Sequence, residues 1–146
     1  MNETSSPLIH PASCVAIAGR GILIEGEPGS GKSSLALALI DRGAHFVCDD
    51  GVLLNNGAGR LIARPHPNTR GLLEVRNLGI LTLPALDSVV VALRIRLDRQ
   101  APRFIERAET SQLANMPLPL VRLWPDGGPL AIKAELALAH YGIQQA

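Results

Sequence analysis

Eight residues near the start of the sequence have the types and the spacing of a phosphate-binding loop. The segment 26–33, GEPGSGKS, fits the pattern G-x-x-x-x-G-K-[ST]. Glycines let consecutive backbone N–H groups curve around an anion, and the start of the following helix adds positive potential. In this pattern the lysine contacts the β- and γ-phosphates of a nucleotide, and the hydroxyl ligates Mg²⁺. The pattern therefore predicts a nucleotide site formed by Gly26, Glu27, Pro28, Gly29, Ser30, Gly31, Lys32 and Ser33.

Two adjacent carboxylates, Asp49 and Asp50, follow this loop at the end of the next apolar segment. Beside a magnesium nucleotide, a carboxylate can accept the proton of an attacking hydroxyl or position the metal. The alternative interpretation is a solvated turn between two strands. A guanine-reading N-K-x-D motif is excluded, because neither Lys32 nor Lys133 follows an asparagine. The carboxylate pair favours an enzyme that transfers a phosphoryl group.

The loop needs a strand before it and a helix after it, and the sequence predicts both. Residues 13–26, SCVAIAGRGILIEG, contain two apolar runs separated by a turn at 18–21, which predicts a hairpin leading into the loop. Residues 33–42 place Leu35, Leu39 and Ile40 on one helical face, and Gly43 follows as a stop signal.

The rest of the chain reads mainly as strands, with a predicted loose arm at 1–9. Strands are expected over 44–48, directly after Asp50, at 60–65, at 88–98 and at 118–125, and a closing helix at 129–141. Residues 72–86 have a mixed pattern that assigns no element. The polar segment 99–117 is predicted to be a loop with a short helix.

Composition limits the class of protein to which the chain belongs. Its 146 residues suggest one domain over 1–146, and aromatic residues make up only 3%, so the core must consist of Leu, Ile, Val and Ala. A net charge of +1 gives no reason to expect a nucleic-acid or membrane partner. Cys14 and Cys48 lie in apolar runs without metal or redox spacing, which predicts buried free thiols and a cytoplasmic protein.

Two segments together resemble the HPr kinase/phosphorylase family. The first is GEPGSGKSSLALALIDRGAHFVCDD at 26–50, and the second is RGLLEVRNLGIL at 70–81. In that family a phosphate loop leads into a helix, an Arg-Gly turn and a strand that ends in Asp-Asp. The family signature, apolar-E-apolar-R-G-x-G-apolar, corresponds here to Leu73–Ile80. The similarity extends over residues 10–97.

The resemblance implies a fold, an activity and roles for individual residues. The fold would be α/β, with a nucleotide domain like that of phosphoenolpyruvate carboxykinases. The activity would be ATP- and Mg²⁺-dependent phosphorylation of a serine on HPr or a related phosphocarrier, by a protein that can form homo-oligomers. Lys32 would stabilise the transferred charge, Ser33 and Glu74 would ligate Mg²⁺, and Asp50, with Asp49 beside it, would act as the base. His10 would correspond to a family active-site histidine; the alternative is an ordinary histidine in the arm.

The sequence also departs from the family pattern. Asn77 stands where the family has glycine, which puts the turn after Arg76 in question. No arginine-rich loop of the R-P-G-R-N kind occurs near the end of the chain, where Arg122 stands alone. These departures predict a protein that works mainly as a kinase, with weak reverse phosphorylase activity. They also leave two alternatives: a nucleotide-binding regulatory module with degraded catalysis, and a small-molecule kinase.

Overall fold

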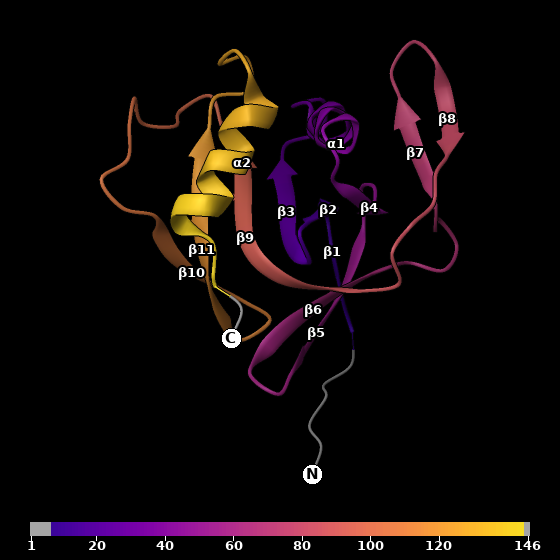
Figure 1. Ribbon diagram of the computed structural model, residues 1–146, viewed down its shortest axis with the longest axis horizontal. Helices are drawn as coiled ribbons and strands as arrows, with labels where there is room; N and C mark the ends of the chain where they lie inside the picture. The colour runs from indigo at the N-terminus through magenta and orange to yellow at the C-terminus, as the bar shows by residue number, and fades with distance from the viewer. Residues whose placement is uncertain (1–6, 145–146) are drawn as a thin grey trace.

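The computed structural model describes residues 7–144, which form one large sheet, two helices and a separate hairpin (Figure 1). Seven of the nine strands in the sheet lie in the order β1-β5-β6-β9-β3-β2-β4, while β11 pairs with β9 and with β10. The sheet strands are β1 Leu8–His10, β2 Ser13–Ile17, β3 Arg20–Gly26, β4 His45–Cys48, β5 Val52–Gly57, β6 Arg60–Pro65, β9 Val89–Leu97, β10 Glu109–Leu113 and β11 Met116–Leu123. The helices are α1 Lys32–Asp41 and α2 Leu130–Tyr141, and the hairpin consists of β7 Leu72–Val75 and β8 Gly79–Thr82.

The strand β9, VVVALRIRL, organises the sheet. It is almost entirely buried and runs parallel to both β3 and β11. Because the carboxyl ends of parallel strands meet at one edge of a sheet, the segments that follow these three strands leave at the same edge. Those segments are 27–31, 98–108 and 124–129. The glycine-rich loop therefore lies at this edge.

Both helices cover one face of the sheet. Alternate residues of β3 and β9, Ile22 and Ile24 with Leu93 and Ile95, point to this face and are completely buried. The helices contribute small and branched apolar residues to the same core: Leu35, Ala36 and Leu39 from α1, and Ala131, Ala134, Ala137 and Leu138 from α2. This packing fixes the start of α1 at the carboxyl edge of β3.

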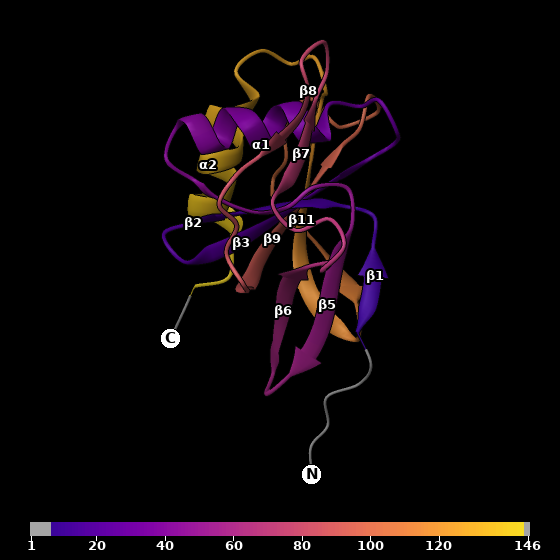
Figure 2. The same ribbon diagram turned by 90° about the vertical axis from the view of Figure 1, so that its right-hand side faces the viewer.

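The opposite face is covered by strands. In the view of Figure 2, α1 lies above β2 and β3, and the β5–β6 pair lies below them. The second core contains Leu23 of β3, Leu54 of β5 and Leu61 of β6. Cys14 and Cys48, which the register places opposite each other in β2 and β4, are free and buried in this core, as predicted. Burial raises the pKa of the Cys14 thiol well above its usual value.

The β7–β8 hairpin stands apart from the large sheet and beside α1 (Figure 1). Its attachment is narrow. Leu73 is its only completely buried residue among those described, and Leu83 N–H donates to the Gly71 carbonyl at 2.8 Å where the hairpin leaves the body. Gly71 has a φ of +80°, which glycine adopts without strain.

Most of the predicted elements are confirmed, including the 13–26 hairpin, the helix after the loop, the closing helix and the strands at 45–48, 60–65, 89–97 and 116–123. Two segments differ. Leu8 and Ile9, expected in a loose arm, form β1 with His10 and pair with β5, whereas residues 1–6 lie outside the described part. The short helix expected within 99–117 is wrong, because 109–113 form the edge strand β10. Neither helix in the described part has the length and hydropathy needed to cross a bilayer.

Candidate functional site

The glycine-rich loop leaves the carboxyl end of β3 and turns directly into α1. Gly29 and Gly31 have φ values of +81° and +106°, a region that glycine adopts far more readily than other residues. A Cβ atom at Gly26 would lie 2.5 Å from the Ser30 hydroxyl and 3.2 Å from the Leu97 carbonyl oxygen. A side chain at Gly26 would therefore force the loop away from β9. Glycine at these positions is what allows the backbone to curl at this edge.

The start of α1 is arranged to attract an anion. Gly31 is the cap residue of the helix and has no side chain that could bond to the first N–H groups, and the first turn contains no acidic residue. The partial positive charge of the helix end is therefore not neutralised locally. Lys32 folds back over the loop, and its Nζ donates to the Gly26 carbonyl at 3.1 Å. Both features place positive potential at the mouth of the loop.

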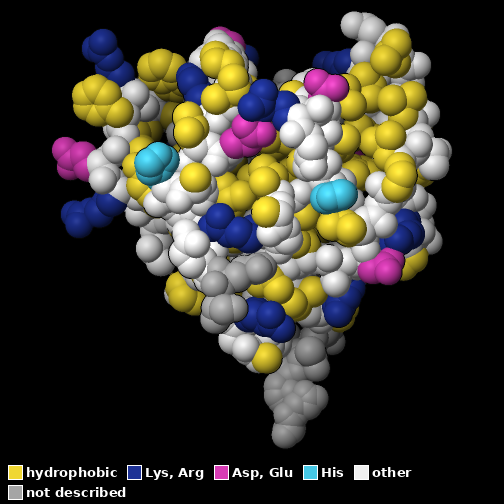
Figure 3. Space-filling view, viewed as in Figure 1, with side chains coloured by type: hydrophobic (Ala, Val, Ile, Leu, Met, Phe, Trp, Pro, Cys, Tyr) yellow, Lys and Arg dark blue, Asp and Glu magenta, His cyan; other side chains and the backbone are white. Residues whose placement is uncertain are grey.

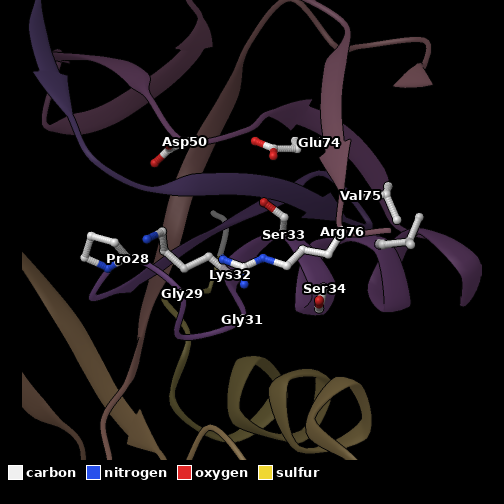
Figure 4. A pocket seen from close by; sticks show the side chains of 11 residues that line it. Pro28, Gly29, Gly31, Lys32, Ser33, Ser34, Asp50, Glu74, Val75 and Arg76 are labelled. Carbon is white, nitrogen blue, oxygen red and sulfur yellow. The ribbon is translucent and has the colours of Figure 1, made fainter. Parts of the chain in front are cut away.

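A cavity of about 360 Å³ opens above this loop. Three segments that are distant in sequence build it: the loop with α1, Asp50 two residues after β4, and the end of β7 with Arg76 (Figure 4). Ser33 points up toward Glu74 and Asp50, whereas Ser34 points to the other side. The lining residues are Pro28, Gly29, Gly31, Lys32, Ser33, Ser34, Leu37, Asp50, Glu74, Val75 and Arg76.

Asp49 joins these segments together. Its Oδ1 accepts hydrogen bonds from the hydroxyls of Ser33, at 2.6 Å, and Ser13, at 2.9 Å. Its Oδ2 accepts a bond from the backbone N–H of Glu74 at 3.2 Å. The carboxylate thus connects α1, β2 and β7 at one point. The sequence predicted Asp49 as one of a catalytic pair, but it did not reveal the Ser13 contact, which depends on the pairing of β2 with β4.

Asp50 has a different environment from its neighbour. Its side chain is exposed at the cavity, and its backbone N–H donates to the Ser13 hydroxyl at 3.3 Å. Its φ of +52° is unusual for a residue other than glycine. This conformation turns the carboxylate out of the strand direction and toward the mouth of the loop, where an incoming group can reach it (Figure 4).

Oxygen donors suited to a hard divalent cation surround the loop. Glu74 and Asp50 bring carboxylates to the cavity, and the Ser33 hydroxyl lies between them and the loop. Mg²⁺ usually takes one or two protein carboxylates and completes its shell with phosphate oxygens and water. The residues predicted to bind the metal therefore fit a magnesium nucleotide.

Arg76 is a cavity residue to which the sequence assigned no role of its own. It extends from the end of the hairpin strand across the loop, with Nη2 3.7 Å from the position that a Gly29 Cβ would take (Figure 4). Its guanidinium forms no ion pair with any described residue. The signal was present in the sequence, because residues two apart in a strand share a face and Glu74 was already a candidate.

The turn after Arg76 has asparagine in a backbone conformation that usually favours glycine. Asn77 has a φ of +71°, and the N–H of Leu78 donates to the Val75 carbonyl at 3.0 Å. Asparagine tolerates this left-handed conformation better than other residues with a Cβ. Asn77 can therefore replace a glycine here and leave Arg76 in the cavity.

A family model described as the HPr Serine kinase C-terminal domain matches residues 3–116, which is well over half of the chain. This chain belongs to the HPr kinase C-terminal domain family. The resemblance expected from the loop, the Asp pair and the Glu74–Arg76 segment is thereby confirmed.

Two relatives match this chain over only part of their own length. The HPr kinase/phosphorylase of Clostridium beijerinckii is 51% identical over 86 residues, 57% of this chain and 28% of that protein. The HPr kinase/phosphorylase of Clostridium tetani is 46% identical over 82 residues, 56% of this chain and 27% of that protein. The chain therefore spans little more than a quarter of the length of these two relatives.

A solved structure matches nearly the whole of this chain. The Hpr(Ser) kinase/phosphatase from Coxiella burnetii aligns with a TM-score of 0.81 and 27% identity, over 90% of this chain and 88% of that one. This match confirms the mixed α/β fold expected for an HPr kinase domain.

His10, predicted as a catalytic residue, lies at a buried charge cluster in this family member. Its Nε2 is 2.8 Å from Glu25 Oε2, and it does not line the cavity. Glu25 is only 1% exposed and also accepts bonds from Arg94, at 2.7 and 3.0 Å, and from Arg96, at 3.1 Å. Because Glu25 directly precedes Gly26, the cluster anchors the base of the glycine-rich loop. A catalytic role for His10 stays a prediction.

This cluster predicts an acid-dependent loss of stability. Burial alone would raise the pKa of Glu25, but bonds from His10 and Arg94 outweigh it and lower the pKa from about 4.5 to about 2. The ionised carboxylate therefore contributes stability in full above pH 4.5, and this contribution is lost as the pH falls toward 2. The difference between the two pKa values corresponds to about 3 kcal/mol.

Glu25→Gln should therefore lower the free energy of unfolding by about 3 kcal/mol at pH 7, because Arg94 would keep a buried charge without its counter-ion. Urea denaturation at pH 7 and at pH 3 measures this difference. The gap between the wild type and the variant should be smaller at pH 3. An equal gap at both pH values would contradict the assigned pKa.

Arg122 does not serve as a free cation. It bonds to Glu109 at 2.6 Å and to Asp98 at 3.1 Å, and these contacts raise its pKa further, with the Glu109 bond as the main cause. Of its acidic partners, Glu109 begins β10 and Asp98 directly follows β9. Arg122 is therefore committed to an ion-pair network, and Arg76 is the arginine that lines the cavity.

Proposed function

We propose that this chain is an ATP- and Mg²⁺-dependent kinase that phosphorylates a serine of HPr or of a related phosphocarrier. The observation that carries the proposal is the convergence of Lys32, Asp50 and Arg76 on one cavity from three separate segments. The names of the clostridial relatives and of the Coxiella protein support HPr as the acceptor. The proposed site is a phosphate cradle with a carboxylate on one side and a guanidinium on the other.

The reaction requires a proton acceptor and a stabiliser of negative charge. The serine Oγ attacks the γ-phosphorus, the Oγ–P bond forms, and the bond to the β,γ-bridging oxygen breaks to release ADP. Asp50 is placed to take the hydroxyl proton, since its carboxylate is exposed at the cavity. Lys32 and Arg76 hold the equatorial phosphate oxygens, on which charge is spread in the transition state.

The remaining polar residues position the reacting groups. Asp49 fixes the Ser33 hydroxyl at 2.6 Å and holds the Glu74 backbone, so that the donor set keeps one orientation. Ser33 and Glu74 would hold Mg²⁺, which when bound neutralises phosphate charge. The backbone N–H groups at the start of α1 would bind the phosphates.

Radiolabelled ATP tests the proposed activity. Purified protein, Mg²⁺ and [γ-³²P]ATP should label an HPr carrier, and a carrier whose acceptor serine is replaced by alanine should stay unlabelled. Mass spectrometry should find phosphoserine. A protein that binds ATP but labels neither carrier would contradict the kinase and favour the nucleotide-binding module.

Arg76→Ala should lower kcat about 10²-fold, the usual effect of removing one preorganised donor from a transition state. The affinity for ATP should fall much less, because Lys32 and the loop remain. Arg76→Lys should recover only part of the rate, since lysine lacks the planar pair of donors. The matched control is Arg64→Ala, an exposed arginine on β6 that bonds to Asn55. Steady-state kinetics that show equal rates for both alanine variants would remove Arg76 from the mechanism.

A further inference from the structure

The β7–β8 hairpin exposes an unusual amount of apolar side chain. Four of the eleven exposed large hydrophobic residues among those described lie on it, so such residues gather here rather than scatter over the surface. We call three of them the hairpin patch: Leu72, Leu78 and Ile80, with exposed fractions of 37, 75 and 68%. The fourth, Leu81, pairs with Leu73 and lies on the other face of the hairpin. Figure 3 shows hydrophobic side chains gathered over the region where Figure 1 places β7 and β8. Concentrated exposed apolar surface marks a binding surface.

The strand register connects this patch to the cavity. Ile80 is paired with Glu74, and Leu72 with Thr82, so these four side chains share one face of the hairpin. Glu74 lines the cavity. The apolar surface of Ile80 therefore begins directly beside the cavity wall, and Leu78 extends it from the turn that carries Arg76. Anything that covers Ile80 lies against the mouth of the cavity.

Hydrogen bonds also link the hairpin to the candidate site residues at the cavity. The N–H of Glu74 donates to Asp49, and Asp49 holds the Ser33 hydroxyl. Within residues 7–144 the hairpin has little other attachment, since Leu73 is its buried anchor and β7 and β8 pair only with each other. A two-stranded hairpin of this kind is marginally stable alone. A partner that orders it would therefore also fix Glu74 and Arg76 against the loop.

We propose that the hairpin patch is the docking surface for the protein that receives the phosphoryl group, and that it binds an apolar segment beside the acceptor hydroxyl. This inference rests on the proposed function. The acceptor must bring its hydroxyl to Asp50, and the patch is the apolar surface that continues from the wall of that cavity. A second copy of this chain seated on Ile80 would instead cover the cavity mouth and hinder the acceptor. The geometry thus favours the phosphocarrier as the occupant.

Ile80→Asp tests the patch, with Leu136→Asp as the matched control. Leu136 is 53% exposed on α2, which packs on β9 and β11 and supplies none of the residues that line the cavity. Ile80→Asp should raise the KM for the HPr carrier about tenfold or more, the effect of losing one interface anchor, and leave the affinity for ATP unchanged. Leu136→Asp should change neither value. Leu78→Ser, a milder change in the exposed turn, repeats the test should Ile80→Asp fold poorly.

Three results would overturn the proposal. The first is an unchanged KM for the carrier in both patch variants. The second is a fall in molecular mass, measured by light scattering, that accompanies the loss of activity, because the patch would then join copies of this chain. The third result applies where the wild type does not phosphorylate the carrier, a failure that contradicts the proposed function but does not by itself decide the docking surface. In that event calorimetry of carrier binding decides: binding that Ile80→Asp weakens supports docking, and no binding to the wild type refutes it.

Discussion

Lys32→Ala should abolish phosphoryl transfer and weaken ATP binding. In the structure Nζ rests on the Gly26 carbonyl at 3.1 Å and reaches the Glu27 carbonyl at 3.5 Å, so it is held over the loop by neutral acceptors. Phosphate oxygens carry full charge and form stronger bonds with an ammonium group than carbonyls do. The side chain is therefore expected to move from the backbone onto the β- and γ-phosphates when a nucleotide binds.

The loss should exceed about 10³-fold in kcat/KM, because this cation serves both the bound nucleotide and the transition state. The chain provides a matched control, since its other lysine, Lys133, lies on α2 and bonds to the Gly127 carbonyl. Lys133→Ala should keep the activity. Calorimetry with ATP and the ³²P transfer assay measure both variants. Equal ATP affinity in the wild type and in Lys32→Ala would refute the phosphate-binding role of the loop.

The parts of the site that could be predicted are those fixed by local sequence. The loop, α1 and the strand that directly precedes Asp49 follow each other within 25 residues, and each carries its own signal of glycines, helical periodicity or an apolar run. The family resemblance added Glu74 from a distant segment. Asn77 departs from the glycine of the family pattern, yet asparagine adopts the left-handed backbone conformation that this position requires.

The parts that could not be predicted depend on contacts between distant segments. Ser13 meets Asp49 only because β2 pairs with β4, and His10 meets Glu25 just before β2, whose pairing with β3 sets Ser13 opposite Ile24. The strand β10 has the sequence ETSQL, whose polar residues suit an edge strand but show no apolar alternation, so this pattern predicts a loop and helix instead. Apolar alternation in a sequence marks strands with one buried face, and an edge strand with little buried surface does not show it.

Arg76 shows the same limit at the level of charge. The sequence places twelve arginines along the chain, and their positions do not reveal which of them are neutralised. The structure separates them, because Arg94 and Arg96 are bound to Glu25 and Arg122 to Glu109 and Asp98. An arginine that forms an ion pair with a carboxylate cannot also bind phosphate without losing that carboxylate. The cationic groups that remain for the cavity are those without acidic partners, and this selection is a property of the fold.

Asp50→Asn should separate nucleotide binding from chemistry. The substitution keeps the size of the side chain and removes the proton acceptor, so kcat should fall by at least about 10²-fold, the usual contribution of a general base. The backbone should not be disturbed, because asparagine tolerates the φ of +52° that position 50 requires. The affinity for Mg²⁺-ATP and the thermal stability should therefore stay close to those of the wild type.

Asp49→Asn is the informative comparison for this variant. Asp49 accepts bonds from Ser13, Ser33 and the Glu74 backbone, and an amide has only one oxygen with which to accept. This neighbouring change should loosen the hairpin, raise the Mg²⁺ concentration needed for activity and lower the melting temperature. Transfer kinetics, a Mg²⁺ titration and thermal denaturation of both variants distinguish the two roles. If Asp50→Asn transfers normally while Asp49→Asn loses the rate without any loss of stability, the base is Asp49, and the exposed carboxylate at the cavity mouth has no part in the proton transfer.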